Sequence, residues 1–189
     1  MKTYREFITE VVQQHTSADT SLNQVAAGIK HAVKSGMIKP NSINVDVGGG
    51  RFDAGKEHVE SNVSGANMHV YDPFNREQSH NERVKSIASS NSDYVGMHNV
   101  LNVIKEPDQR LEALKTVKSF MKPKGIAHIT VYEGDKSGSG RISKQDKGRG
   151  SSWQEHRPTA SYVPEVKKIF PEHSHDVQVK GKHIIVTAK

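Results

Sequence analysis

The feature that most constrains the fold of this chain is a short β-rich run that ends in three consecutive glycines. Residues 43–47 read INVDV, the glycines occupy 48–50, and residues 54–62 can form a helix of low apolar content. A second β-rich run, MHVYD at 68–72, follows that helix. Glycines let the backbone turn tightly between a strand and its crossover helix, so this order predicts a βαβ unit with parallel strands.

The rest of the chain continues the alternation of strands and helices. Two amphipathic helices, over 4–12 and 22–33, precede the glycine run. We expect one α/β domain over 1–189 with a mostly parallel sheet, an antiparallel C-terminal hairpin and a helical N-terminal cap over 1–37. The elements expected after the first unit are a polar helix over 75–89, an apolar run at 93–104, a helix over 107–121, a turn at 123–125, a strand at 126–133, a short helix over 162–170 and a hairpin of 176–179 with 183–188.

The composition excludes several kinds of chemistry. The chain contains no cysteine, so disulfides, cysteine-ligated zinc, iron–sulfur clusters and thiolate nucleophiles are excluded. Its 11 histidines show no spacing that indicates a metal site, and we expect no metal. No stretch approaches about 18 consecutive apolar residues, so we expect a soluble, cytoplasmic protein without a membrane partner. The net charge of +6 favours anionic partners, although a solvated basic surface explains it equally well.

A shift in composition marks the segment 134–157, which is rich in glycine, serine and lysine. Between 134 and 152 it carries five cations against two acids. We expect a flexible, basic surface loop that covers the substrate, with Arg141 and Lys144 among its contacts. Trp153 can stack on a nucleobase or can anchor the loop to the core. His156 has the chemistry of a general base near neutral pH, although any one histidine among 11 is a weak candidate.

The glycine run and the acid after the second strand together predict a nucleotide site. The glycines let the backbone approach a ligand closely, and Asp72 can accept hydrogen bonds from ribose hydroxyls, although it can also serve only as a strand-end cap. Asp46 lies two residues before Gly48, where it would repel a pyrophosphate and stabilise an ammonium or sulfonium group. The dinucleotide pattern G-x-G-x-x-G also fails, because its third glycine position is Asp53. These features disfavour a nicotinamide oxidoreductase.

These residues resemble the class I S-adenosylmethionine-dependent methyltransferases. In that family the first strand ends in an acid-x-Gly-x-Gly turn, which Asp46, Gly48 and Gly50 match, and Asp72 matches the acid after the second strand. The usual third glycine is Phe52 here. The segments INVDVGGGRFD, VYDPFN and NVLNVI also resemble small methyltransferase-like proteins of bacteria and their phages.

The resemblance implies a Rossmann-like methyltransferase sheet and S-adenosylmethionine as the cofactor. MKPKG at 121–125 matches the family's turn after its long helix. Only about 20 residues separate Asp72 from Asp93, so we expect the family's third strand, with its adenine-contacting acid, to be abbreviated or missing. The cofactor-binding residues that the resemblance implies are Asp46, Gly48, Gly49, Gly50, Asp72, Pro73, Phe74 and Asn99.

The resemblance also places acceptor-side residues after the fourth strand, in the segment MHNVLNVI. Tyr132 and Glu133 end the next strand, and sites in α/β sheets lie beyond the carboxyl ends of strands. The segment lacks the Asp/Asn-Pro-Pro-aromatic motif of amino-directed nucleic-acid methyltransferases, and no cysteine is available for carbon-5 methylation of a pyrimidine. The expected catalytic residues are His98, Asn99 and Tyr132, and the expected substrate-binding residues are Asn102, Glu133, Arg141, Lys144, Trp153 and His156.

Two functions therefore stay open on the sequence alone. The first is a methyltransferase, active as a monomer or homodimer, whose acceptor is a small molecule, a nucleotide or a nucleic acid. The second is a catalytically silent module that binds S-adenosylmethionine or nucleic acid on the same fold. A shared fold does not distinguish them, because activity depends on the site.

Overall fold

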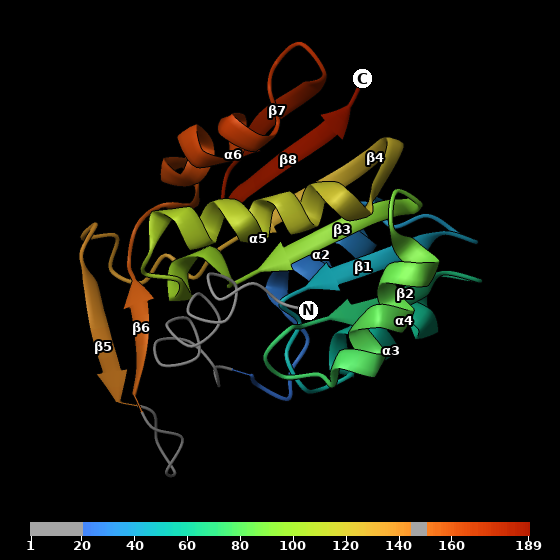
Figure 1. Cartoon of the computed structure of the whole chain (residues 1–189), viewed down its shortest axis with the longest axis horizontal. Helices are drawn as coiled ribbons and strands as arrows, with labels where there is room; N and C mark the ends of the chain where they lie inside the picture. The colour runs from blue at the N-terminus through green and yellow to red at the C-terminus, as the bar shows by residue number, and fades with distance from the viewer. Residues whose placement is uncertain (1–20, 145–150) are drawn as a thin grey trace.

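The computed structural model describes residues 21–144 and 151–189. Most of its strands form one central sheet with helices packed on both faces (Figure 1). The strands are β1 (Ile43–Val47), β2 (Asn67–Tyr71), β3 (Ser92–His98), β4 (Met121–Thr130), β5 (Gly140–Lys144), β6 (Ser151–Glu155), β7 (His175–Lys180) and β8 (His183–Ala188). The helices are α2 (Ala27–Lys34), α3 (Ala54–Asn62), α4 (Gln78–Ala88), α5 (Pro107–Phe120) and α6 (Val163–Ile169), and the 3-10 turns are η1 (Leu101–Val103) and η2 (Thr159–Tyr162).

The central sheet has the strand order β2-β1-β3-β4-β8-β7. β2, β1, β3 and β4 run parallel, whereas β8 is antiparallel to β4 and β7 is antiparallel to β8. The predicted parallel sheet with an antiparallel C-terminal hairpin is confirmed. Among the described residues no strand lies outside β2, and the chain between β2 and β3 forms α4. The expected loss of a third strand is therefore confirmed as well.

Side chains take the place of that strand at the β2 edge. Glu60 of α3 accepts a hydrogen bond from the backbone N–H of Met68 at 3.2 Å. His80 of α4 places its Nε2 2.8 Å from the carbonyl oxygen of Val70. A strand edge with free backbone groups is costly when half-buried and prone to pair with other chains, so these two contacts make the shortened sheet tolerable.

Two apolar cores hold the layers together. One lies between the sheet and the pair α2 and α3, with Ile29, Val59 and Met68 fully buried. The larger one lies on the opposite face beneath α4, α5 and α6, where Leu114 and Val117 of α5 are fully buried. α5 begins at a proline in its first turn, as the sequence predicted, since proline lacks the N–H that the first turn leaves unpaired.

Some element boundaries differ from the sequence prediction. The second N-terminal helix was expected from residue 22 but begins at Ala27, and residues 21–26 are non-helical. The first N-terminal helix lies outside the described residues. The MKPKG segment was expected to be a turn but forms the start of β4, where the register with β3 shifts. Lys124 there has a φ of 62°, so the segment is an irregular strand rather than a loop.

The basic segment 134–157 was expected to be a loop, and this expectation is wrong for the two strands that it contains, β5 and β6. β5 and β6 pair as an antiparallel hairpin with Ile142 opposite Trp153, while 145–150 lie outside the described residues. The Trp153 ring packs on Gly140, where an added Cβ would lie 1.8 Å from the ring. The hairpin projects beyond the carboxyl ends of β1 and β3 (Figure 1).

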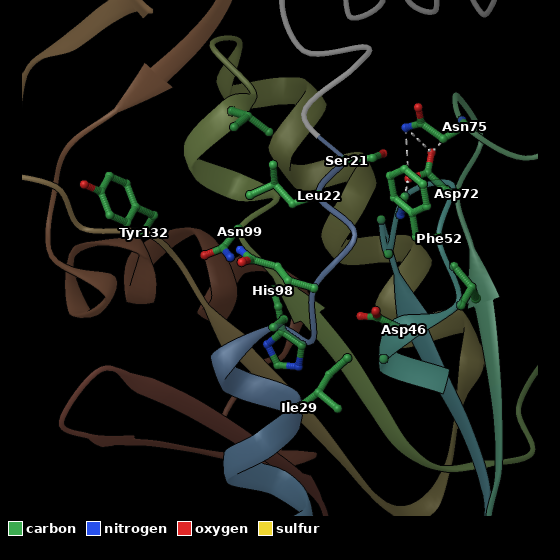
Figure 2. A pocket seen from close by; sticks show the side chains of 18 of the residues that line it. Ser21, Leu22, Ile29, Asp46, Phe52, Asp72, Asn75, His98, Asn99 and Tyr132 are labelled. Atoms are coloured by element: carbon green, nitrogen blue, oxygen red, sulfur yellow. Dashed lines mark hydrogen bonds between the residues drawn. The ribbon is translucent and has the colours of Figure 1, made fainter. Parts of the chain in front are cut away.

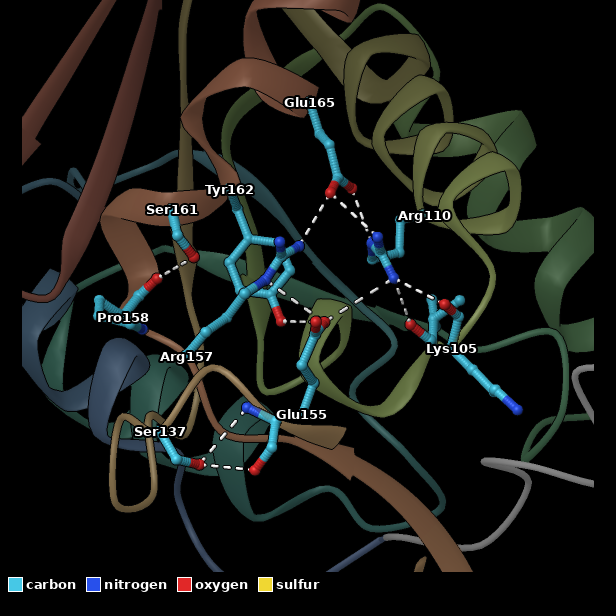
Figure 3. Close-up of polar contacts among 11 residues, drawn as sticks. Lys105, Arg110, Ser137, Glu155, Arg157, Pro158, Ser161, Tyr162 and Glu165 are labelled. Atoms are coloured by element: carbon cyan, nitrogen blue, oxygen red, sulfur yellow. Dashed lines mark hydrogen bonds and ion pairs between the residues drawn. The ribbon is translucent and has the colours of Figure 1, made fainter. Parts of the chain in front are cut away.

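A buried ion network holds the base of this hairpin against α5 and α6 (Figure 3). Arg110 of α5 donates two hydrogen bonds to Glu165 of α6, at 2.7 and 3.1 Å. Arg157, just after β6, donates to the same carboxylate at 2.8 Å and lies over the ring of Tyr162. Burial acts to raise the pKa of Glu165, but the hydrogen bonds from Arg110 and Arg157 outweigh it and the pKa is lowered. The network thus fixes Gln154 of β6 near the carboxyl ends of the parallel strands.

Candidate functional site

A cavity of about 510 Å³ opens at the carboxyl ends of β1, β2 and β3 (Figure 2). The glycine turn forms its floor, and the non-helical segment 21–26 runs along one side. Tyr132, after β4, and Gln154, from the hairpin, complete the rim. In parallel α/β sheets ligands bind beyond the carboxyl ends of the strands, so this cavity is the expected place for a site.

The glycine turn requires glycine for two separate reasons. Gly48 and Gly50 have φ angles of 75° and 77°, a region that other residues rarely adopt. A Cβ on Gly48 would also lie 2.5 Å from Val100 Cγ2, and a Cβ on Gly49 would lie 2.5 Å from the Asp46 carboxylate. Side chains therefore have no room on this turn, whose own hydrogen bonds hold it in place: Gly48 N–H donates to the Tyr71 carbonyl oxygen at 2.7 Å and Gly50 N–H donates to the carboxylate that follows β2 at 2.8 Å.

Asp46 presents an unpaired carboxylate to this cavity. The side chain is buried at 7% exposure, and its Oδ1 has no hydrogen-bond partner among the described residues. Burial, with a smaller contribution from the nearby Asp72, raises the pKa of Asp46 to about 7. A buried acid without a partner is destabilising, and a cationic ligand group would offset that cost. The carboxyl group, which lines the cavity, is thus a ready site for an ammonium group.

Asp72 already accepts several hydrogen bonds from the protein. Its Oδ1 accepts from the backbone N–H groups of Phe74 and Asn75, both at 2.9 Å, and its Oδ2 accepts from Gly50 N at 2.8 Å. The Asn75 amide also bridges both oxygens at 3.2 Å. Asp72 therefore acts as a cap at the end of β2, which was one of the two roles that the sequence allowed for it. It also ties the glycine turn to β2. Ribose hydroxyls remain a predicted partner, and they would replace the two long bonds from Asn75.

Negatively charged side chains line the cavity, whereas the whole chain carries a net positive charge. Among the described residues that line it, Asp46 and Asp72 are the charged side chains, and lysine and arginine do not contribute. Arg76, which contacts the turn, is held by the Gly50 carbonyl and by Asp53 and lies outside the lining. The local field is therefore negative although the chain carries a net charge of +6.

A second, smaller pocket of about 240 Å³ adjoins the first across Gly48 and Asn99. Apolar side chains from the strand ends and η1 line it, and Pro73 and Phe74 contribute to its wall. Polar side chains reach it from α5, namely Gln109, Glu112 and Thr116, and from the side shared with the main cavity, namely Asp72, Asn75 and Asn99. The expected cofactor-binding residues thus divide between two connected pockets. A pocket with apolar walls and a few polar groups suits an aromatic base.

The far end of the main cavity carries uncharged polar side chains. Asn99 points into it with a φ of 61°, a strained conformation for a residue other than glycine. Asn102 is 1% exposed and its Oδ1 has no hydrogen-bond partner among the described residues. His98 also lines this end, but both ring nitrogens already have partners, Tyr94 and Thr130. A buried amide oxygen without a partner at the edge of a cavity indicates a ligand that supplies a hydrogen bond.

Several expected substrate-binding residues lie outside both pockets. Glu133 accepts a hydrogen bond from Thr159 N at 2.9 Å and pairs with Lys136 at 3.2 Å. Burial acts to raise the pKa of Glu133, but those two contacts outweigh it and the pKa is lowered. Arg141 pairs with Asp135 at the hairpin base, and its guanidinium contacts His156.

Trp153 also does not line the cavity. It packs on Gly140, and Lys105 lies over its ring at 5.2 Å. Of the two roles that the sequence allowed for Trp153, these contacts fit the anchoring of the segment and not stacking on a nucleobase. Lys144 ends β5, and its side chain lies outside the described part of the chain. Sequence reasoning missed Leu22, Gln24 and Gln154, which do line the cavity. They carry no motif, because their place depends on how distant segments fold over the turn.

Neither a membrane-spanning helix nor a metal cluster occurs among the described residues. None of their helices has the length and apolar character needed to cross a membrane. No group of three or more of their histidine, aspartate or glutamate side chains is arranged to hold a metal ion.

Comparison with known proteins identifies the architecture. No protein-family model and no curated protein sequence matches the chain. A putative S-adenosylmethionine-dependent methyltransferase from Listeria monocytogenes is 14% identical, with 86% of this chain and 99% of that chain covered and a TM-score of 0.51. A TehB-like methyltransferase from Corynebacterium glutamicum is 14% identical, with 86% and 88% covered and a TM-score of 0.51.

A third solved structure is phosphoethanolamine N-methyltransferase 1 of Haemonchus contortus, crystallised with phosphoethanolamine and S-adenosylhomocysteine. It is 12% identical, with 98% of this chain and 50% of that chain covered and a TM-score of 0.55. At such low identity these likenesses concern the fold. The chain has the Rossmann-like fold of the class I S-adenosylmethionine-dependent methyltransferases.

Proposed function

We propose that this protein is an S-adenosylmethionine-dependent methyltransferase with a small-molecule acceptor. The observation that carries the proposal is the unpaired, buried Asp46 carboxylate beside a glycine turn, in a cavity at the carboxyl ends of the parallel strands. S-adenosylmethionine is a cationic nucleoside, and this cavity offers it an acid, a turn without side chains and an adjoining pocket with an apolar wall.

The residues of the chain divide the work of holding such a ligand. Asp46 would pair with the ammonium group, the turn at 48–50 would lie against the ligand backbone, and Asp72 would accept from the ribose. The adjoining pocket would receive the base. The cofactor supplies a methyl group on a sulfonium, and the enzyme's contribution is to position the acceptor and exclude water. Asn99 and Asn102 are suited to that positioning.

The charge of the cavity supports a small-molecule acceptor over a nucleic acid. A phosphate entering the cavity would meet two carboxylates and, among the described lining residues, no lysine or arginine. Charge repulsion of this kind costs several kcal/mol in a poorly solvated site. The same argument disfavours the pyrophosphate of a nicotinamide dinucleotide. A silent binding module stays the alternative, but it would not need the unpaired Asn102 amide oxygen at the acceptor end.

Replacing Asp72 with alanine is expected to weaken binding of S-adenosylhomocysteine by about 1.5–3 kcal/mol, because a charge-assisted acceptor is lost and the Gly50 N–H loses its partner. Calorimetric titration measures this directly. Asp53→Asn is the control, since it removes an acid just outside the cavity and should leave the affinity unchanged. Wild-type affinity in a folded Asp72→Ala protein would remove Asp72 from the site.

Methyl transfer itself is testable without knowing the acceptor. We would incubate the protein with S-adenosylmethionine labelled in its methyl group and with the small-molecule and macromolecular fractions of a cell extract. Label should pass to the small-molecule fraction, and the Asp46→Asn protein should transfer none. Label in nucleic acid would overturn the acceptor class. Tight cofactor binding with no transfer to any fraction would favour the silent module.

A further inference from the structure

A chain of hydrogen-bonded side chains runs from the cavity toward the surface on the α2 side of the sheet. His98, which lines the cavity, has its Nδ1 3.0 Å from the hydroxyl of Thr130 and its Nε2 3.0 Å from the hydroxyl of Tyr94. The same Tyr94 hydroxyl lies 3.0 Å from His128 Nδ1. His128 Nε2 lies 2.8 Å from His183 Nδ1. Five side chains from β3, β4 and β8 thus form one unbroken line.

The fold makes room for this chain at its cavity end. A Cβ on Gly28 of α2 would lie 2.2 Å from His98 Nδ1, and a Cβ on Gly96 of β3 would lie 2.7 Å from His98 Nε2. Neither glycine has a positive φ, so the space for the ring is what each provides. The His98 ring therefore sits between two glycines with both nitrogens aimed at hydroxyl groups.

The chain can hold its protons in two complete arrangements. In the first, Thr130 donates to His98, His98 donates from Nε2 to Tyr94, Tyr94 donates to His128, and His128 donates from Nε2 to His183. In the second, every bond is reversed, and His98 and His128 both carry their proton on Nδ1. Each hydroxyl can either donate or accept a hydrogen bond, and each neutral imidazole donates from one ring nitrogen and accepts at the other. Both arrangements therefore satisfy every group in the chain.

The imidazoles in the middle of this chain stay uncharged. Burial, reinforced by the neighbouring histidines, lowers the pKa of His98 to about 3 and that of His128 to about 2. Burial also raises the pKa of Tyr94 well above its ordinary value, with a smaller contribution from Asp46. A proton therefore crosses the chain only by a shift of all members together, which converts one arrangement into the other without a lasting charge.

The outer end of the chain is partly open to solvent. His183 begins β8 and is half-buried, and the ring of His31 from α2 stacks on it with centroids 4.0 Å apart and planes 20° apart. Burial lowers the pKa of His183, with a smaller contribution from His31. A proton that reaches His183 can leave from Nε2, which makes no hydrogen bond to another of the described residues.

We infer that this line of side chains carries the proton of the methyl acceptor from the cavity to the surface, and that the acceptor is consequently an N–H or O–H nucleophile. The inference rests on the proposed function. Transfer to such an acceptor forms its bond to the methyl carbon, breaks the carbon–sulfur bond and leaves the electron pair on sulfur. The proton of the acceptor passes through water to Thr130 Oγ1, which is 9% exposed and lies beside the lining residue His98 rather than in the cavity lining itself, and the chain releases a proton at His183.

The test is the tautomeric state of the histidines, measured by ¹⁵N NMR of the free protein at neutral pH. In the wild type, His98 and His128 should carry their proton on the same nitrogen, or exchange together between Nδ1 and Nε2. Tyr94→Phe should uncouple them, because the nitrogens that face the phenyl ring lose their partner. His98 would then keep its proton on Nδ1 and His128 on Nε2. The relay would be overturned if His98 carried its proton on Nδ1 and His128 on Nε2 already in the wild type. It would also be overturned if the tautomers did not change in the Tyr94→Phe variant.

Thr130→Val tests the first member of the chain, next to His98, without disturbing the shape of the side chain. With an acceptor from the labelling assay, both variants should lower kcat by about 100-fold at neutral pH and lose less at high pH, where solvent base removes the proton. Binding of S-adenosylhomocysteine should stay within about twofold of wild type in both. An equal loss at every pH would contradict the relay. Failure of the wild type to bind S-adenosylhomocysteine would instead overturn the proposed function and leave the tautomer result standing.

Discussion

Replacing Asp46 with asparagine is expected to weaken cofactor binding strongly and, at the same time, to make the protein more stable at neutral pH. Binding should weaken by about 3 kcal/mol, more than about 100-fold, because the ligand's ammonium group loses a buried ionic partner. Stability should rise because the variant no longer has to bury an acid whose pKa is raised from 3.8 to about 7. A residue that costs stability and serves only a ligand is the signature of a binding site.

The sign of the stability change follows from the two pKa values. Between pH 4 and 7 the unfolded chain releases the Asp46 proton while the folded protein retains it, so wild-type stability falls as pH rises through this window. At about 1.36 kcal/mol per pKa unit the penalty reaches about 2–4 kcal/mol above pH 7. Denaturant unfolding at pH 4 and pH 8 measures it. Asp46→Asn should match the wild type at pH 4 and exceed it at pH 8, and equal stability at both would refute the buried charge.

Replacing Arg110 with methionine is expected to remove a large part of the stability of the fold. Arg110 is 5% exposed, and besides Glu165 it donates to the carbonyl oxygens of Ile104 and Lys105, both at 2.9 Å. Removing one partner from a buried ion network leaves the others unpaired and costs about 3–5 kcal/mol. The melting temperature should fall by about 6–20 °C for a chain of this size.

Lys115→Ala is the matched control for this change. It breaks an ion pair on the same helix, but Lys115 and its partner Glu112 are each 58% exposed. Exposed pairs of this kind contribute about 0–1 kcal/mol, so the melting temperature should barely move. If Arg110→Met melts within about 2 °C of the wild type, the network does not hold the hairpin base. Hydrogen exchange in β6 should also quicken in the Arg110 variant, since Arg157 and the hairpin lose part of their anchor.

The sequence was informative where local pattern and packing agree. The glycines at 48–50 sit where positive φ and close contacts demand them, and Asp46 and Asp72 lie where the βαβ spacing put them. The missing third strand followed from the short interval after β2. These features depend on segments adjacent in the chain, whose pattern carries the signal.

Features made by distant segments could not be predicted in the same way. The hairpin of β5 and β6 was hidden by a composition of glycine, serine and lysine, and its stability comes from Arg110 and Glu165 on separate helices. The histidine chain joins His98, His128 and His183, which are widely separated in the sequence. The spacing of these residues along the chain does not predict such contacts, because only tertiary packing brings the side chains together.

Calorimetric titration of the wild-type protein with S-adenosylmethionine, S-adenosylhomocysteine and NAD tests the central claim most directly. Both sulfur nucleosides should bind at a single site, and NAD should give no binding heat because its pyrophosphate meets Asp46 and Asp72. Binding of S-adenosylmethionine should also release a proton near pH 6.5, since pairing with the ammonium group lowers the raised pKa of Asp46. Tight binding of NAD, or no binding of either sulfur nucleoside, would contradict the assignment of this cavity.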